Sequence, residues 1–271
     1  MPFFRIAPDG SVPAGGGRLV YYAHVPKCGG SAVATYIAER FGPPAFHDNR
    51  HLSVPEPQRW SRTSPQHIDA GTLERLIPLD YFDAIFAVVR HPVARIVSTY
   101  HFQREVEGTI PEGMGFSDWL ALLDPNPAGT PFAYDNHIRP MDDIVPQGAA
   151  VFHLEHGLDA LVPWFDHVAG RADGPRAILP ENTRGAYVKG AGSAPASPPA
   201  TPTPADLARI ATLYAADFAR FGYEPASRAP KAPPPAMTPE ALAARDRALA
   251  AARAPLARTL RGLGRRLRRL A

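Results

Sequence analysis

The segment that most constrains the fold is residues 19–41, because its pattern changes from strand to helix across a glycine-rich turn. An apolar run rich in β-formers leads into Pro26-Lys27-Cys28-Gly29-Gly30-Ser31, and apolar residues then recur at helical spacing through Phe41. Such a turn directs backbone N–H groups and the positive end of a helix dipole toward one point. Lys27 adds a positive charge there, and Ser31 adds a hydroxyl. The segment therefore predicts a phosphate or other oxyanion site rather than an ordinary strand–helix turn.

The order of residues in this turn excludes two common nucleotide-binding loops. Lys27 precedes the glycines, whereas a Walker A loop places Lys-Ser/Thr after them, and no GxGxxG follows the strand. We therefore expect neither an ATPase of the usual type nor a dinucleotide dehydrogenase. A kinase is also disfavoured, because no acidic residue stands where a Walker B aspartate would hold Mg²⁺.

A second strand–helix unit lies at residues 82–104. Its continuous apolar run, residues 85–89, is typical of a buried parallel strand, and Pro92 suits the first turn of the helix that follows. Arg90 comes directly after the strand, where open α/β sheets bind ligands, so we predict that it binds an anion. For Arg95, on the helix, anion binding and a solvated surface position remain equal alternatives.

Together the two units resemble the sulfotransferases that use 3′-phosphoadenosine 5′-phosphosulfate (PAPS), and the match is closest to the carbohydrate and heparan-type branch, sulfotransferase family 2, as a bacterial member. The first motif of this branch, roughly H-x-P-K-[TC]-G-G-[ST]-[ST], is matched from His24 to Ala32, where alanine replaces the last hydroxyl. The second, roughly V-R-[NDH]-P-x-x-R-x-x-S-x-Y, is matched from Val89 to Tyr100. The resemblance covers about residues 18–225. It implies an α/β fold, a P-loop-like three-layer α/β/α sandwich with a central, mostly parallel sheet.

The resemblance also implies PAPS as the sulfate donor, without a metal, and it assigns roles to residues. Arg90 and Ser98 would hold the 3′-phosphate of PAPS. A third family-like segment, residues 180–184, would bring Arg184 to the nucleotide, as would Lys189 beyond it, with solvated loop charge as the equal alternative for both. No spacing of a metal motif such as CxxC or HExxH occurs. The first loop would hold the 5′-phosphosulfate through Pro26, Lys27, Cys28, Gly29, Gly30, Ser31 and Ala32.

The chemistry of sulfuryl transfer needs two catalytic groups. Negative charge grows on the oxygen that leaves sulfur, and Lys27 with the loop N–H groups is placed to stabilise it. The acceptor hydroxyl must lose a proton to a base. His67, in a Pro-Gln-His segment similar to one in related bacterial sequences, is our candidate, with a helix-capping or surface histidine as the alternative. His24 is the second candidate, although its position on the strand favours packing against the loop, and His47 and His51 lie in a polar segment that is able to face an acceptor.

The C-terminal residues differ in composition from the rest of the chain. From Arg228 onward there are eleven Lys/Arg and two acidic residues, whereas the whole chain carries a net charge of only +3. Leucines recur at helical spacing opposite arginines, as in a basic amphipathic helix that binds a membrane surface or an acidic partner. A solvated tail and a helix docked on the main domain are the alternatives. We expect no nucleic-acid binding, because no aromatic residues interleave with these charges.

The sequence predicts three parts: a loose lead-in at residues 1–17, a sulfotransferase domain at 18–225, and a Pro/Ala linker with a basic helical tail at 226–271. Helices are expected at 117–123 with Ser117 as the cap, at 158–168 and at 206–221, and a strand at 149–154. No run approaches the length of a membrane span, and the first ten residues do not read as a signal peptide. The single cysteine, Cys28, excludes an intrachain disulfide, and its loop position predicts some reactivity.

These observations favour a cytoplasmic enzyme that is able to associate with the inner face of a membrane. It would transfer a sulfuryl group in line to a hydroxyl of a carbohydrate or glycolipid acceptor. The alternative is a non-catalytic module that binds a phosphorylated nucleotide or a membrane surface.

Overall fold

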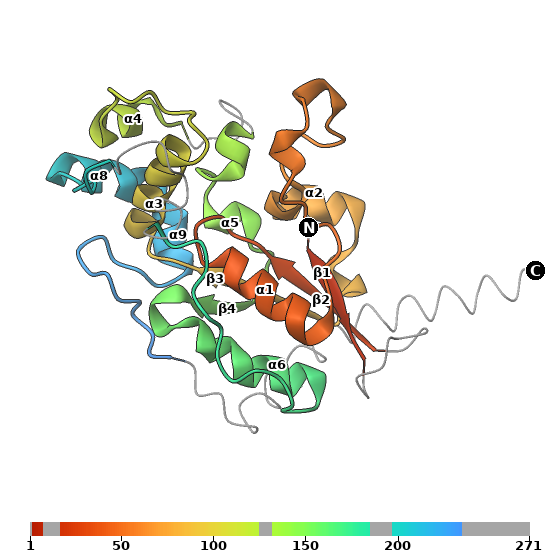
Figure 1. The fold of residues 1–271 in the computed structure, drawn as a ribbon. Coiled ribbons are helices and arrows are strands. Elements are labelled where there is room, and N and C mark those ends of the chain that lie inside the picture. The colour runs from red at the N-terminus through yellow and green to blue at the C-terminus, as the bar shows by residue number, and fades with distance from the viewer. Residues whose placement is uncertain (1, 8–16, 125–131, 185–196, 235–271) are drawn as a thin grey trace, which may run out of the picture.

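The computed structural model describes residues 2–7, 17–124, 132–184 and 197–234. Its strands are β1 (Phe3–Ile6), β2 (Arg18–Ala23), β3 (Ala84–Val89) and β4 (Ala150–His153). They form one sheet in the order β1-β2-β3-β4, in which β1 is antiparallel to β2 and the other two pairs are parallel (Figure 1). The expected strand at 149–154 is therefore present, and the sheet is mixed.

β1 corrects the expectation of a loose lead-in. Its residues alternate, so that Phe4 and Ile6 are buried while Arg5 points outward. The ring of Phe4 stacks on Phe41 with centroids 5.4 Å apart. This short segment thus completes the edge of the sheet and its core, a role that the prolines and glycines after it concealed.

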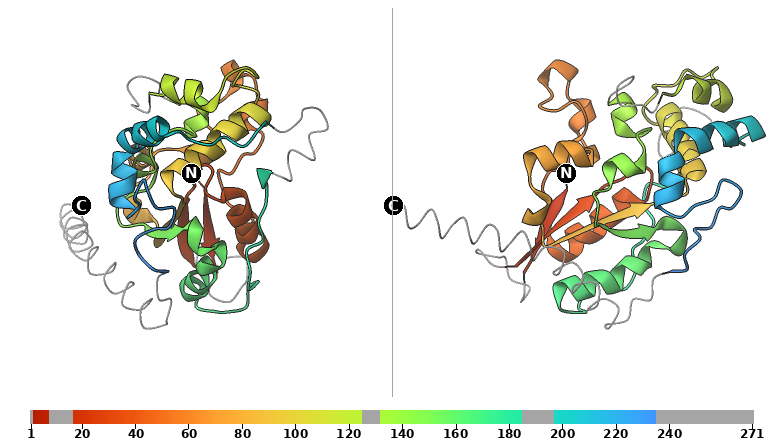
Figure 2. Two further views of the ribbon diagram at one scale, coloured as in Figure 1. Left: turned by 90° about the vertical axis from the view of Figure 1, so that its left-hand side faces the viewer. Right: turned by 180° about the vertical axis from the view of Figure 1, so that it is seen from behind.

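The described helices surround this sheet: α1 (Gly30–Phe41), α2 (Ala70–Leu76), α3 (Pro92–Glu105), α4 (Phe116–Leu122), α5 (Met141–Ile144), α6 (Leu161–Ala169), α8 (Pro204–Leu213) and α9 (Ala215–Arg220). In all the views α6 lies on one side of the sheet and α2, α3 and α5 lie on the other (Figures 1 and 2). Aromatic packing joins α1 and α6 to the sheet, since the ring of Phe165 lies 5.4 Å from Tyr36 and 5.3 Å from Phe86.

The helices expected at 206–221 and at 117–123 differ in the structure from the sequence-based expectation. The helix expected at 206–221 is broken at Tyr214, whose hydroxyl donates to Ile138 O and whose backbone leaves the helical region. The break turns α9 so that Asp217 accepts hydrogen bonds from the backbone of Met141 and Asp142. Ser117 does not cap α4, which begins after Gly115; its hydroxyl donates to Asp206 instead.

The helix expected at 158–168 begins later than the sequence suggested. Residues Leu158–Ala160 form a 3₁₀ turn, and α6 starts at Leu161. Pro163 then falls in the first turn of α6, where its missing N–H costs no helical hydrogen bond.

The two strand–helix units that the sequence singled out are neighbours in the sheet. β2 pairs in parallel with β3, so that Ala23 lies opposite Ala87 and both chains leave the sheet at the same edge. The turn before α1 and the turn before α3 therefore open into one cleft of about 1920 Å³. No described helix is both long and apolar enough to span a membrane. The basic tail from residue 235 and Lys189 lie outside the described residues.

Candidate active site

The two glycines of the first loop, Gly29 and Gly30, are required for different structural reasons. Gly29 adopts a left-handed backbone (φ 82°), as does Lys27 (φ 65°), which is unusual for a residue with a side chain. Gly30 is required for space, because a Cβ there would fall 1.7 Å from Nε2 of His24. Gly29 is thus needed for its backbone conformation, and Gly30 for the space that it leaves to His24. His24 packs against the start of α1, as its strand position suggested.

Cys28 is turned away from the cleft. The cleft is lined by the other loop residues, Pro26, Lys27, Gly29, Gly30, Ser31 and Ala32. The Cys28 side chain is fully buried, and its thiol donates to Pro26 O at 3.6 Å. Burial raises the pKa of this thiol to about 12, more than the nearby arginines lower it. The expectation of a reactive cysteine was wrong, since a helix N-terminus does not offset such desolvation.

Lys27 carries its charge in a partly desolvated position. Its Nζ lies 3.8 Å from the ring centroid of Phe102 on α3, a cation–π contact. Burial and then the charge of Arg90 lower its pKa to about 8, against opposing effects of Cys28 and Glu107. Lys27 forms no ion pair with the described residues, so an anion in the cleft would be a favourable partner.

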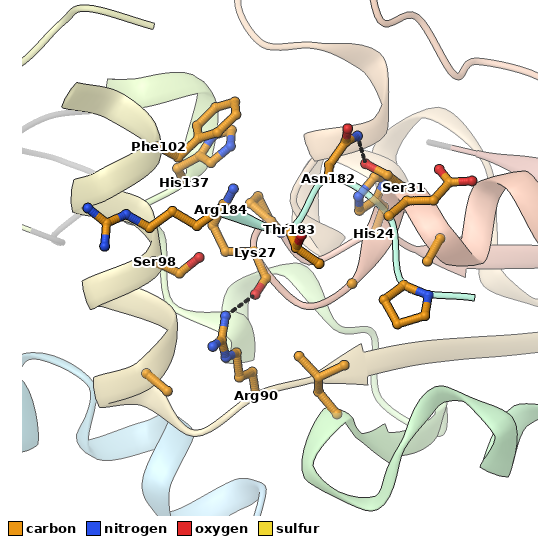
Figure 3. A pocket seen from close by; sticks show the side chains of 18 of the residues that line it. His24, Lys27, Ser31, Arg90, Ser98, Phe102, His137, Asn182, Thr183 and Arg184 are labelled. Atoms are coloured by element: carbon orange, nitrogen blue, oxygen red, sulfur yellow. Dashed lines mark hydrogen bonds between the residues drawn. The ribbon is translucent and has the colours of Figure 1, made fainter. Parts of the chain in front are cut away.

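Arg90 stands beside this loop. Its Nη1 donates to the carbonyl oxygen of Lys27 at 3.2 Å, and Ser98 of α3 lines the same cleft (Figure 3). Arg95 neither lines the cleft as an anion-binding residue would nor lies on the solvated surface. It is fully buried and donates to the backbone carbonyls of His137 and Arg139, so its role is structural.

Residues 180–184 cross the cleft from α1 to α3. Asn182 donates to the hydroxyl of Ser31 at 2.9 Å, so this segment contacts the first loop, which the sequence did not predict (Figure 3). Arg184 pairs with Glu105 of α3, with Nε 2.9 Å from Oε2. Burial alone would raise the pKa of Glu105, but hydrogen bonds from Arg184 and Ser197 lower it to about 2. The charge of Arg184 is therefore largely committed to Glu105.

His67 belongs to a buried hydrogen-bonded group. Its Nδ1 lies 2.7 Å from Oδ2 of Asp135, and Asp135 also accepts from the backbone and the hydroxyl of Ser64 at 2.5 and 2.6 Å. The hydrogen bond and charge of His67 hold the pKa of Asp135 below its usual range, despite the opposing effect of burial. The alternative that His67 caps a helix was wrong, because Asp69 caps α2.

Asp135 sits on a strained turn that sequence reasoning missed. Tyr134, Asp135 and Asn136 all have positive φ (49°, 55° and 61°), a costly conformation for residues with side chains. Asn136 helps to hold it by donating to His67 O at 2.8 Å. Strain that survives beside a buried histidine is typical of a functional site. No local signal marks this turn in the sequence, because its partner is 68 residues away.

Three further histidines surround His67. The ring of His24 lies 5.2 Å from it, that of His137 4.9 Å, and that of His47 6.0 Å from His24. Burial, and then the charge of His67, lower the pKa of all three, so they are neutral at physiological pH. His51 is buried and does not line the cleft.

His67, Asp135 and His137 also have the composition of a metal site. One potential ligand atom from each lies within 4.8 Å of the others. Two of the ring nitrogens already have partners, since His67 Nδ1 is bound to Asp135 and His137 Nδ1 lies 2.7 Å from Tyr134 O. This arrangement leaves the Nε2 atoms of both rings for a ligand or a proton.

The sequence was compared with models of known protein families. The family model described as the sulfotransferase family matches residues 18–224, which include both strand–helix units, the His67–Asp135 pair and the segment 180–184. The chain belongs to the sulfotransferase family. No curated protein and no solved structure matches it. Arg228 lines the cleft of this sulfotransferase although it lies beyond the family match, in the segment that the sequence assigned to the linker.

Proposed function

We propose that this sulfotransferase moves the sulfuryl group of PAPS to a hydroxyl of a carbohydrate or glycoconjugate. The observation that carries the proposal is that the anion-binding loop and the His67–Asp135 pair open into one cleft. A donor bound at the loop would thus lie within reach of a base.

The described residues fit PAPS at both ends. Lys27, the N–H groups at the start of α1 and the Ser31 hydroxyl, oriented by Asn182, would hold the 5′-phosphosulfate. Arg90 and Ser98 would hold the 3′-phosphate, and Arg184 and Arg228 line the same cleft. The sheet would then be the central layer of a P-loop-like sandwich.

His67 would remove the acceptor proton. With Asp135 accepting from Nδ1–H, the lone pair of Nε2 is left to accept a proton from the hydroxyl. Asp135 would also stabilise the imidazolium that forms, as a buried carboxylate does in a catalytic triad. Lys27 would stabilise the negative charge that develops on the oxygen leaving sulfur.

Transfer from radiolabelled PAPS to a panel of glycans tests the proposal. We expect label to pass from PAPS to at least one hydroxylated glycan, with release of 3′-phosphoadenosine 5′-phosphate. Tight binding of that product without transfer to any acceptor would instead support a non-catalytic nucleotide-binding module.

We also propose that the basic tail binds an anionic membrane surface and so brings the cytoplasmic enzyme to glycolipid acceptors. A chain ending at Pro234 should keep its activity on a soluble sugar. It should lose activity only on acceptors in anionic vesicles, and the advantage of the full chain there should fade with salt. Loss of activity on soluble sugars too would assign the tail to the catalytic domain.

A further inference from the structure

Charge is unevenly distributed along the cleft. Among the described residues that line it, the lysines and arginines are Lys27, Arg90, Arg184 and Arg228. Arg90 contacts the loop carbonyl of Lys27, and Arg184 is paired with Glu105 on α3. We assign these side chains to the nucleotide. The carboxylates Asp159 and Glu181 also line the cleft, and they accept hydrogen bonds from Ile178 N and the Thr35 hydroxyl.

The part around His67 has carboxylates and histidines but no lysine or arginine among the described residues, and we call it the acceptor half: His24, His47, Asp48, His67, Glu107, Asp135 and His137, all of which line the cleft. His24, His47 and His137 have lowered pKa values and are uncharged at physiological pH. Asp135 is ionised and is committed to His67. Lys27 lines the same cleft, and its charge acts to lower the pKa of both Glu107 and His137.

In this half Asp48 accepts a hydrogen bond from the backbone N–H of Arg50 at 2.9 Å, which makes Glu107 the less committed acidic group. It follows α3 on an exposed turn, and its side chain makes no hydrogen bond or ion pair with the described residues. Burial and then the charge of Asp135 raise its pKa, while Lys27 and His67 act in the opposite direction. Glu107 lines the same cleft as Lys27 and His67, the groups that would carry out transfer.

In the acceptor half, an anionic acceptor would therefore lie near carboxylates, with no lysine or arginine among the described residues of that half to neutralise its charge. Lys27, the nearby cation, would already be engaged with the donor, and like charges brought together at an interface weaken binding strongly. A carboxylate is in contrast a good acceptor of hydrogen bonds from sugar hydroxyl or ammonium groups.

We propose that the acceptor is an uncharged or cationic sugar, not a uronate or an already sulfated glycan, and that Glu107 binds its hydroxyl or ammonium groups. This inference rests on the proposed function, because it assumes that the donor lies at Lys27. It makes Glu107 a specificity-determining residue for the acceptor.

Binding and transfer are both measured with three tetrasaccharides: cellotetraose (neutral), a glucosamine tetramer (cationic) and tetragalacturonate (anionic). Binding is measured with 3′-phosphoadenosine 5′-phosphate present, so that it does not depend on catalysis. We expect tetragalacturonate to bind at least ~10-fold more weakly than one of the other two. Glu107→Lys should reverse or abolish this preference, and Glu107→Gln should weaken binding of the cationic tetramer most.

Glu112→Lys is the matched control, because it changes the net charge equally at an exposed residue that does not line the cleft. It should leave the order of the three affinities unchanged. Preferential binding of tetragalacturonate by the wild type, equal binding of all three, or the same shift in the Glu112 variant would each overturn the inference. If a neutral or cationic tetramer binds as expected but receives no label, the acceptor inference stands and the proposed transfer fails.

Discussion

Lys27 combines two features that normally oppose each other: it is a cation, and it is partly removed from water. The aromatic face of Phe102 offsets part of this cost but does not replace an anion. Because its pKa is lowered to about 8, a fraction of the molecules lose this charge in mildly alkaline solution before any ligand binds.

Binding of 3′-phosphoadenosine 5′-phosphate, the anionic product of the proposed reaction, should therefore become weaker as the pH rises through this pKa. The anion favours protonated Lys27, so binding above about pH 8 should be accompanied by proton uptake. Calorimetry in buffers of different ionisation enthalpy measures that uptake directly. Lys27→Arg, which stays protonated, should bind without it; proton uptake of the same size in this variant would assign the effect to another group.

In the proposed mechanism Asp135 acts on catalysis through His67, so it would be a positioning residue. Asp135→Asn should lower kcat by ~10²–10⁴, because an asparagine neither stabilises the imidazolium nor fixes the same tautomer. Its KM for PAPS should change little. The effects of Asp135→Asn and His67→Ala should be far from additive in the double variant, since both remove one unit.

Asp143→Asn is the control for this change, because Asp143 lies close in sequence but pairs with Arg139. A wild-type kcat for Asp135→Asn would show that the activity of His67 does not depend on Asp135. The same would follow if the kcat losses of Asp135→Asn and His67→Ala multiplied in the double variant.

At the scale of elements, the loop between β2 and α1 depends on a close contact between Gly30 and His24. Gly30→Ala would drive a methyl group into the His24 ring, so the loop must shift. We expect weaker nucleotide binding by ~10-fold or more, because the N–H groups at the start of α1 move with it.

The variant Gly30→Ala/His24→Ala tests the cause, since it removes the ring that the methyl group meets. It should regain much of the lost affinity for 3′-phosphoadenosine 5′-phosphate. No recovery would show that Gly30 is needed for its backbone rather than for space.

Elements encoded by a local sequence pattern were predicted correctly, whereas those that depend on long-range contacts were not. Both strand–helix units are encoded locally, as an apolar run, a turn and a helical repeat, and the structure has them where the sequence placed them. β1 was missed because four residues carry too little pattern when a proline and a glycine follow. The break at Tyr214 depends on a contact with Ile138 that no local pattern records.

The distinction between local patterns and long-range contacts also applies to the cleft as a whole. The loop and Arg90 were found from their own strands, and the parallel pairing of β2 and β3 then brings them together. Asp135 and Arg228 enter the cleft through long-range folding of irregular segments, so their residue types alone gave no signal. Asn182 lies in the family-like segment 180–184, but its contact with Ser31 was not predicted. Composition likewise did not reveal that the Cys28 side chain turns into the core.

The central claim is that Lys27 and His67 act on one transferred sulfuryl group. It is tested most directly by single-turnover transfer of label from PAPS to an acceptor, with the wild type, Lys27→Ala and His67→Ala compared. We predict rapid transfer by the wild type, a loss of ~10²–10³ in rate for Lys27→Ala and a loss of ~10²–10⁴ for His67→Ala, with unchanged binding of 3′-phosphoadenosine 5′-phosphate by the histidine variant. Near-wild-type transfer by either variant would exclude that residue from the transfer step.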